Sequence, residues 1–375
     1  MVPRRDCPSC SSPLPHGAAY CDQCGSATHT QIIGTPAPTS DRVSSTYETQ
    51  RDRLQAALGT QLELGALIGR GGYAEVYAVR DRKLERDVAI KVLRPDLILT
   101  PSLLARFRRE ALAVAALQHP GIVAVYDVRE HQGICFIVMP LIRGESLKAL
   151  LQRQKRLPID EVRRIVTEAA TALAAAHRAN FVHRDIKPEN IMLEEPEGRV
   201  RLMDFGIAKA VDSTEIDLTG TGVVVGTPQY MSPEQAAGEP NVDARSDQYS
   251  LAVVTYQMLS GRPPFEGETA RAVIAKQLLD QPPALSTLVD DLPPHIVAAL
   301  HRAMQKNPAD RFDSITDFAA ALADPEYQNP PALIARDKAL AAAGARSPWP
   351  WVGGAVLAVG LVAVMFYEPP KHEGF

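Results

Sequence analysis

A cluster of polar and charged residues near the middle of the chain has the side-chain types needed for a reaction that transfers a charged group. Asp185, Lys187 and Asn190 lie close together in sequence, and Asp204 follows them. A carboxylate can orient a hydroxyl group and accept its proton, and an ammonium can neutralise a phosphate. Carboxylate and amide oxygens are the ligands that Mg²⁺ prefers. A solvated polar loop is the alternative, and we interpret the cluster as a site for a reaction that moves a highly charged group.

The letters around these residues resemble motifs of one enzyme family. Residues 183–190 read HRDIKPEN and residues 204–206 read DFG, which resemble the catalytic loop and metal-binding motif of eukaryotic-type protein kinases. The letters KPEN are similar to those of the Ser/Thr branch. The resemblance covers about residues 61–325. It implies an α+β, bilobal protein-kinase fold with a β-rich N-lobe and an α-rich C-lobe.

The resemblance also assigns roles to the four residues. It implies that Asp185 is the catalytic base and that Lys187 steadies the γ-phosphate of ATP. Asn190 and Asp204 would hold Mg²⁺ or Mn²⁺ ions.

Strand-like runs at 62–68, 73–79 and 88–93 precede this site, and the glycine-rich letters GRGGYAEV lie at 69–76. Glycines let backbone N–H groups close over phosphates, although glycine pairs also make ordinary hairpin turns. In the family pattern G-x-G-x-x-G-x-V, Ala74 replaces the third glycine, and we expect only a slightly stiffer loop.

Lys91 stands inside an apolar strand, where a lysine needs a partner or loses its charge. A helical stripe at 103–117 carries Glu110, the partner that the resemblance implies, although an exposed helix charge is the alternative. A further strand at 134–142 resembles the hinge between lobes, with Met139 as gatekeeper. The ATP contacts that the resemblance implies are Ile68, Gly69, Arg70, Gly71, Gly72, Tyr73, Ala74, Val76, Ala89, Lys91, Glu110, Met139, Pro140, Ile142, Asn190 and Asp204.

The segment after residue 206 resembles an activation segment. Thr227 matches the threonine that bridges the catalytic Asp and Lys in Ser/Thr kinases, and a simple turn residue is the alternative. Thr219 and Thr221 are the expected phosphorylation sites, since Arg184 precedes Asp185 and could pair with a phosphate.

Three further features resemble scaffold residues. Asp247 would hold the catalytic loop, and Arg311 would pair with Glu234. Cys135, on the hinge strand, is expected to fill the core rather than to react.

The other cysteines lie near the N-terminus, as the pairs Cys7–Cys10 and Cys21–Cys24. Two C-x-x-C pairs at this separation can surround Zn²⁺ tetrahedrally. Two disulfides or a redox pair are the alternatives. No apolar signal segment precedes Cys7, so we expect a reducing compartment, where such pairs bind metal.

Residues 349–367 carry no charge and are bordered by Trp349, Trp351 and Tyr367. This length matches a bilayer core and the aromatic residues match its interfaces, although a helix buried on the C-lobe is the alternative. Basic residues before the segment indicate a single-pass cell-membrane protein with a cytoplasmic kinase domain. The expected organisation is therefore 1–25 zinc ribbon, 26–60 linker, 61–325 kinase domain, 326–348 juxtamembrane linker, 349–367 transmembrane helix and 368–375 external tail.

Together these features predict a membrane-anchored bacterial receptor-like Ser/Thr kinase that uses ATP, Mg²⁺ and structural Zn²⁺ in signal transduction. Protein substrates and a homodimer that phosphorylates itself in trans are the expected partners. The net charge of −4 gives no reason to expect nucleic acid. The alternatives are a pseudokinase scaffold and a zinc-ribbon binding sensor.

Overall fold

The computed structural model describes residues 51–71, 74–93, 107–108, 111–131, 134–205 and 228–335, with the backbone of residues 5–6 and 13–14. The chain divides into two compact units, one of Met1–Ala66 with Val79–Arg86 and the other of Leu67–Ala78 with Asp87–Phe375. Several predicted residues lie outside the described residues: Cys7, Cys10, Cys21, Cys24, Gly72, Tyr73, Glu110, Thr219, Thr221, Thr227 and residues 349–367.

In the first unit, residues 51–58 are helical and bury Leu54 and Leu58. The Gln55 side chain fixes the chain that follows, because its Nε2 donates to the Leu62 carbonyl at 3.0 Å and its Oε1 accepts from the Leu64 amide at 2.8 Å. Residues 51–58 therefore form a short helix directly before the first strand.

The largest sheet has five strands in the order β3-β4-β5-β7-β6. Its strands are β3 (Leu62–Arg70), β4 (Ala74–Asp81), β5 (Arg86–Leu93), β6 (Asp127–His131) and β7 (Ile134–Pro140). The predicted strands are thus confirmed with shifted ends. The hinge strand ends at Pro140 rather than at Ile142, since proline has no N–H with which to extend the ladder.

A second sheet, of order β10-β9-β8, joins β8 (Gly144–Ser146), β9 (Ile191–Glu194) and β10 (Arg199–Leu202). The β9–β10 hairpin starts directly after Asn190 and ends two residues before Asp204. This hairpin therefore connects the two polar clusters of the sequence.

The rest of the described chain is mainly helical. Its helices are α3 (Leu147–Gln154), α4 (Ile159–Arg178), α5 (Pro233–Ala236), α6 (Ala244–Ser260), α7 (Ala270–Leu279), α8 (Pro294–Ala303) and α9 (Ile315–Ala323). Short 3₁₀ turns lie at η1 (Pro188–Asn190), η3 (Pro228–Tyr230), η4 (Leu285–Thr287) and η5 (Pro308–Asp310).

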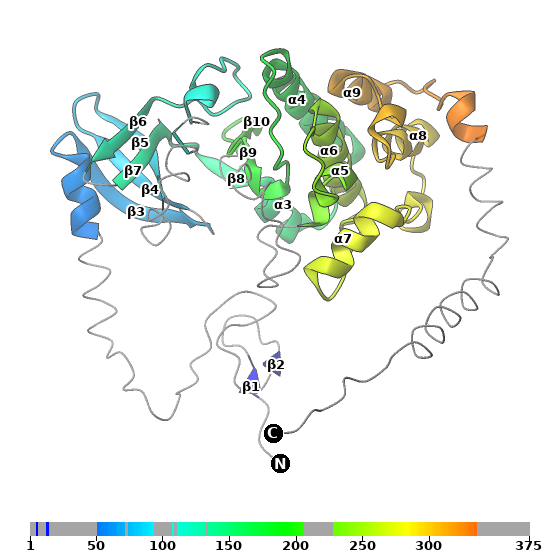
Figure 1. Cartoon of the computed structure of the whole chain (residues 1–375), viewed down its shortest axis with the longest axis horizontal. Coiled ribbons are helices and arrows are strands. Elements are labelled where there is room, and N and C mark those ends of the chain that lie inside the picture. Colours follow the sequence, from blue (N-terminus) through cyan, green and yellow to red (C-terminus); the bar gives the residue numbers. More distant parts are fainter. Residues whose placement is uncertain are drawn as a thin grey trace, which may run out of the picture. The chain divides into compact units, whose positions relative to one another are not determined.

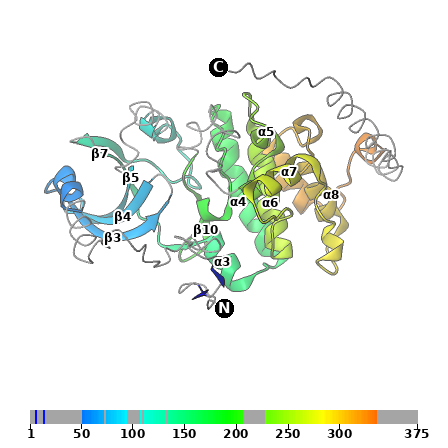
Figure 2. The same ribbon diagram turned by 60° about the horizontal axis from the view of Figure 1, so that its bottom comes forward.

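Helices α4 and α6 form the centre of this region, and α9 and α8 pack beside them (Figure 1, Figure 2). Helix α4 presents a face of fully buried small residues, among them Ala169, Ala170 and Ala172, so its neighbours approach closely. Nearly every residue of α6 is buried, as expected for a helix surrounded by others. Asp247 therefore lies in the protein interior at the first turn of α6.

Packed structure continues beyond α9. The Tyr327 ring lies 5.6 Å from that of Phe312, and Leu333 is buried. The stretch that the sequence suggests as a linker from residue 326 therefore begins with ordered contacts. Within the described part of the chain, no helix combines the length and apolarity needed to span a bilayer.

Candidate active site

Asp247 holds the backbone of the predicted catalytic loop, residues 183–190, in place. Its Oδ2 accepts the His183 amide and its Oδ1 accepts the Arg184 amide, both at 2.8 Å. His177 of α4 adds a contact of 2.8 Å between its Nε2 and Oδ2. This confirms the predicted role of Asp247, whose carboxylate is 1% exposed.

The side chains of the loop converge on Asp185. Its Oδ2 lies 2.8 Å from the Lys187 ammonium and accepts the Asn190 amide group at 3.0 Å. Asn190 also donates to the Asp185 carbonyl at 2.8 Å. Pro188 begins the 3₁₀ turn η1, which brings Asn190 back toward Asp185. The carboxylate is thereby oriented by two donors from its own loop.

Asp204 lies beside this group. The Met203 amide donates to the Asn190 carbonyl at 2.9 Å, which aligns the two segments. The Lys91 ammonium of β5 lies 2.7 Å from Asp204 Oδ1. Arg184 and Asp204 both adopt left-handed backbone conformations, with φ of 64° and 57°. Such conformations are costly for residues with side chains and occur often at functional sites.

His183 connects the two segments in the interior. Burial lowers its pKa, so the ring is neutral. Its Nε2 donates to the Met203 carbonyl at 3.0 Å and its Nδ1 accepts from the Asp185 amide at 3.3 Å. The Phe205 ring packs on it at 4.4 Å. The histidine thus connects the loop that carries Asp185 to the segment after β10 that carries Asp204.

A comparison with known protein families gives a match to one of them. The family model described as "protein kinase domain" matches residues 62–323 of this chain. The chain belongs to the protein kinase domain family. It is 44% identical over 265 residues to a probable serine/threonine-protein kinase of Streptomyces coelicolor, covering 70% of this chain and 39% of that protein. It is 42% identical over 269 residues to the serine/threonine-protein kinase PknB of Mycolicibacterium smegmatis, covering 71% and 43%. The chain therefore spans about two fifths of these curated relatives.

Solved structures agree with the family. The crystal structure of the Mycobacterium tuberculosis PknI kinase domain aligns with a TM-score of 0.58 at 32% identity, covering 71% of this chain and 96% of that chain. The present chain therefore has the bilobal protein kinase fold, with a β-sheet N-lobe and a helical C-lobe.

The described part of the nucleotide site fits ATP. The Gly71 amide donates to the Ala74 carbonyl at 2.8 Å and closes the β3–β4 turn. A Cβ on Gly69 or Gly71 would meet only ordinary contacts within the chain, so the fold itself leaves room for close approach by a ligand. Ile68 is 52% exposed, which suits an apolar side chain that an adenine covers.

Other residues that the sequence predicts as ATP contacts lie on two paired strands. Ala89 of β5 lies opposite Met139 of β7, and Val88 lies opposite Pro140. Val76 is partly exposed on β4, and Ile142 follows the strand end. Arg70 forms an ion pair of 2.9 Å with Glu75 across the β3–β4 turn.

The donor set also fits a divalent cation. Asp204 offers carboxylate oxygens, and the amide NH₂ of Asn190 is bound to Asp185, which leaves the amide oxygen as the group available to a metal. These are the hard oxygen ligands typical of Mg²⁺. Within the described ranges, no group of three or more His, Cys, Asp or Glu side chains is arranged so that it could hold a metal ion. The four N-terminal cysteines lie outside those ranges.

The remaining scaffold predictions are confirmed. The Arg311 guanidinium binds the Glu234 carboxylate through two bonds of 2.7 Å, and both side chains are buried. Cys135 is 1% exposed, and burial raises the pKa of its thiol to about 11, so it is a core residue. The expected Lys91–Glu110 pair stays a prediction.

Sequence reasoning missed three positioning residues. His177 reaches Asp247, Gln235 Nε2 donates to the Arg184 carbonyl at 2.9 Å, and Lys148 forms an ion pair of 2.9 Å with Glu189 of η1. The three residues lie on three different helices, and none of them belongs to the loop that it supports. The position of His177 six residues before His183 is the one local signal that could have suggested a role.

Proposed function

We propose that this chain is an ATP-dependent, non-specific serine/threonine protein kinase that transfers the γ-phosphoryl group to hydroxyl groups of protein substrates. The observation that carries the proposal is the orientation of the Asp185 carboxylate by Lys187 and Asn190, next to Asp204 held by Lys91. The names of the curated relatives support the same activity.

The residues divide the reaction among them. Asp185 accepts the proton of the substrate hydroxyl group. The oxygen of that hydroxyl group forms the new bond to the γ-phosphorus, while the bond between the γ-phosphorus and the β–γ bridging oxygen breaks. Lys187 and Lys91 place positive charge where negative charge develops on the phosphate oxygens. Asn190 and Asp204 would hold Mg²⁺, which when bound neutralises phosphate charge. Most of the catalysis is then positioning of the reacting groups.

A radioactive ATP assay with a general protein substrate tests this function. Wild type should incorporate label, and Asp185→Asn should lose at least about a hundredfold in rate, the usual effect of removing a general base. The variant should retain ATP binding, since Asp185 contacts the hydroxyl and not the nucleotide. A wild-type chain that binds ATP and transfers nothing would favour the pseudokinase scaffold instead.

We also propose that the N-terminal cysteines form a zinc ribbon in residues 1–25. The backbone of β1 (Arg5–Asp6) pairs antiparallel with β2 (Pro13–Leu14), and the intervening residues include Cys7 and Cys10. Structural zinc contributes roughly 10–16 kcal/mol of apparent binding in small peptides. Absence of zinc from the purified chain by elemental analysis would contradict this proposal, as would retention of zinc by a variant with all four cysteines replaced by serine.

The remaining proposals concern location and regulation. Residues 349–367 would anchor the chain in the cell membrane with the kinase domain of residues 61–325 in the cytoplasm, and homodimers would phosphorylate Thr219 or Thr221 in trans. The support is the uncharged segment and the position of Arg184 directly before Asp185. Replacing both threonines with alanine should lower activity and spare ATP binding. Unchanged activity in that double variant would contradict regulation by phosphorylation of Thr219 or Thr221.

A further inference from the structure

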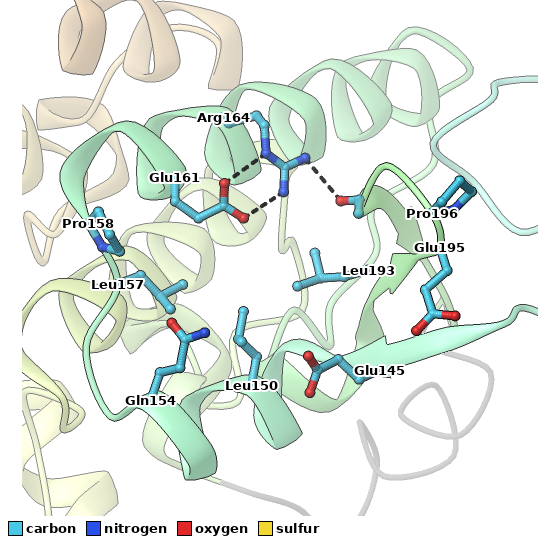
Figure 3. A pocket seen from close by; sticks show the side chains of 11 residues that line it. Glu145, Leu150, Gln154, Leu157, Pro158, Glu161, Arg164, Leu193, Glu195 and Pro196 are labelled. Atoms are coloured by element: carbon cyan, nitrogen blue, oxygen red, sulfur yellow. Dashed lines mark hydrogen bonds and ion pairs between the residues drawn. The ribbon is translucent and has the colours of Figure 1, made fainter.

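A cavity of about 360 Å³ lies between α3, the start of α4 and the turn that joins β9 to β10 (Figure 3). Leu150 of α3, Leu157 and Leu193 of β9 point toward its centre from three separate elements. Its size is at the lower end of the range for ligand sites, about 300–1,000 Å³. No residue of the candidate active site lines it, so the phosphoryl-transfer reaction does not account for it.

The polar lining of this cavity is acidic. Glu145, Glu161 and Glu195 line it together with one basic residue, Arg164. Glu161 is neutralised by Arg164 through bonds of 2.7 and 3.0 Å, and Glu145 contacts the exposed Arg153 at 2.5 Å. In the described part of the chain, the Glu195 carboxylate forms no ion pair. Carboxylates therefore outnumber cations at the cavity, which favours a positively charged ligand.

The walls of the cavity are rigid before any ligand binds. Arg164 donates to the Gly198 carbonyl at 3.0 Å, and Glu168 accepts from the Val200 amide at 2.8 Å, which ties the β9–β10 turn to α4. Directly before the lining residue Glu145, Gly144 of β8 approaches β9 so closely that a Cβ there would lie 2.0 Å from the Leu193 carbonyl oxygen. A pre-formed site lowers the entropy that the protein itself loses when a ligand binds.

We propose that this cavity docks a short segment of a protein partner in which arginine or lysine lies next to leucine-sized side chains. Leu150, Leu157 and Leu193 are 6–7% exposed, so their exposed edges would contact one apolar side chain. Glu195 and Glu145 would contact the basic residue. If the partner is a substrate, which rests on the proposed kinase function, docking would raise its effective concentration near Asp185 without changing the chemistry.

Binding can be measured with three fluorescein-labelled peptides of ten residues. Each consists of Gly and Ser apart from four test positions, which hold two residues of each of two types. One peptide carries two arginines and two leucines, one carries two glutamates and two leucines, and one carries two arginines and two serines. In fluorescence anisotropy, the full-length protein should bind the first peptide at least about tenfold more tightly than the other two. Its affinity should fall as salt is raised, because the carboxylates are near the surface.

Two variants test the location of the site. Gln154→Trp places a bulky ring in the cavity from an exposed position on α3, and Gln152→Trp is its control on the same helix outside the lining. Glu195→Lys reverses the rim charge, and Glu197→Lys is its control on the same turn. The first variant of each pair should weaken binding, by about three- to tenfold for the charge reversal, and each control should leave it unchanged.

The proposal is wrong if the arginine–leucine peptide binds no better than the glutamate–leucine peptide, or if Gln154→Trp and Glu195→Lys bind it as wild type does. Transfer of phosphate to a short peptide without leucine or arginine should be the same in all four variants. A wild-type protein that binds the probe and transfers no phosphate would contradict the proposed function and leave the docking site in place. Normal transfer without probe binding would contradict the docking site alone.

Discussion

At the scale of single residues, one buried carboxylate determines the shape of the catalytic loop. Asp247 accepts hydrogen bonds from the amides of His183 and Arg184 and contacts His177 Nε2. An ionised carboxylate has acceptors on both oxygens and can satisfy these groups together. The left-handed conformation of Arg184 persists because its amide and its carbonyl are both held, by Asp247 and Gln235.

Asp247→Asn should therefore destabilise the protein and reduce phosphoryl transfer. The amide NH₂ would face a backbone N–H, and leaving one buried donor unsatisfied costs about 1–3 kcal/mol. Urea unfolding should show this loss, and the rate should fall at least tenfold because Asp185 moves, by analogy with the cost of small misplacements in active sites. Asp160→Asn is a suitable control, since that carboxylate is 98% exposed. Equal stability of the two variants would contradict the role given to Asp247.

A second residue-scale feature is a lysine with an altered pKa. Lys306 lies over the Phe265 ring at 4.4 Å and donates to the Gln277 carbonyl at 2.7 Å. Burial lowers its pKa to about 8 from the ordinary value of 10.5. Below pH 8 both the folded and the unfolded chain hold the proton. Between pH 8 and 10.5 the unfolded chain holds the proton that the folded chain has lost, so this group makes stability rise with pH.

The difference in unfolding free energy between wild type and Lys306→Met isolates this effect, because other titrating groups are common to both proteins. The difference should be constant below pH 8, should shift in favour of wild type from pH 8 to 10.5, and should be constant again above that. Thermal unfolding across this pH range measures it. A difference that stays flat from pH 7 to 11 would show that Lys306 has an ordinary pKa.

At the scale of elements, the β8–β9 pairing depends on one close approach. Gly144 has a φ of 144°, and a Cβ added there would lie 2.0 Å from the Leu193 carbonyl oxygen. Register places Gly144 opposite Glu194 and Glu145 opposite Leu193. Because β9 begins directly after Asn190, the position of this strand also affects that residue, which we propose as a magnesium ligand.

Gly144→Ala should destabilise the protein by more than a glycine substitution that causes conformational strain alone. Gly238→Ala is the matched control, since Gly238 has a φ of 71° and nothing within 4 Å of the added Cβ. The control should cost about 1 kcal/mol, which is typical of a left-handed position. Gly144→Ala should exceed this by at least about 1–3 kcal/mol, the usual cost of overpacking. Denaturant unfolding of both variants gives the comparison, and equal losses would mean that β8 moves freely away from β9.

At the scale of the whole molecule, the catalytic machinery is contained in a limited part of the chain. The family match ends at residue 323, and the packed residues Tyr327 and Leu333 extend the folded region slightly beyond it. The uncharged segment at 349–367 lies further along the sequence. In the described part of the chain, the contacts of Asp185 with Lys187 and Asn190 and of Asp204 with Lys91 come from residues before this segment.

Removal of residues 347–375 should accordingly release an active kinase from membranes. Cell fractionation should find the full-length chain in the membrane pellet and the truncated chain in the supernatant, with rates toward a protein substrate that agree within about twofold, an energy difference below RT. A chain that ends at residue 335 should behave in the same way. Recovery of both shortened chains only in aggregates would instead favour a helix that packs on the C-lobe.

The sequence by itself identified four polar residues that the structure brings together at the candidate site, and it indicated several of the strands. Asp185, Lys187, Asn190 and Asp204 stand in two short contiguous motifs, so local letters identify them. Strands β3, β4, β5 and β7 lie where the sequence shows strand-like runs. The ends of elements were less well predicted where one residue decides, as at Pro140.

Only the tertiary structure decided which side chains meet. His177 and Asp247 are 70 positions apart, and Gln235 lies 51 positions from the carbonyl that it binds. The acidic cavity combines residues of β8, α3, α4 and the β9–β10 turn, none of which forms a motif. Local propensity acts over a few neighbouring residues, whereas these contacts depend on how helices pack and how strands align. A periodic pattern specifies which face of an element is buried but not which partner covers it.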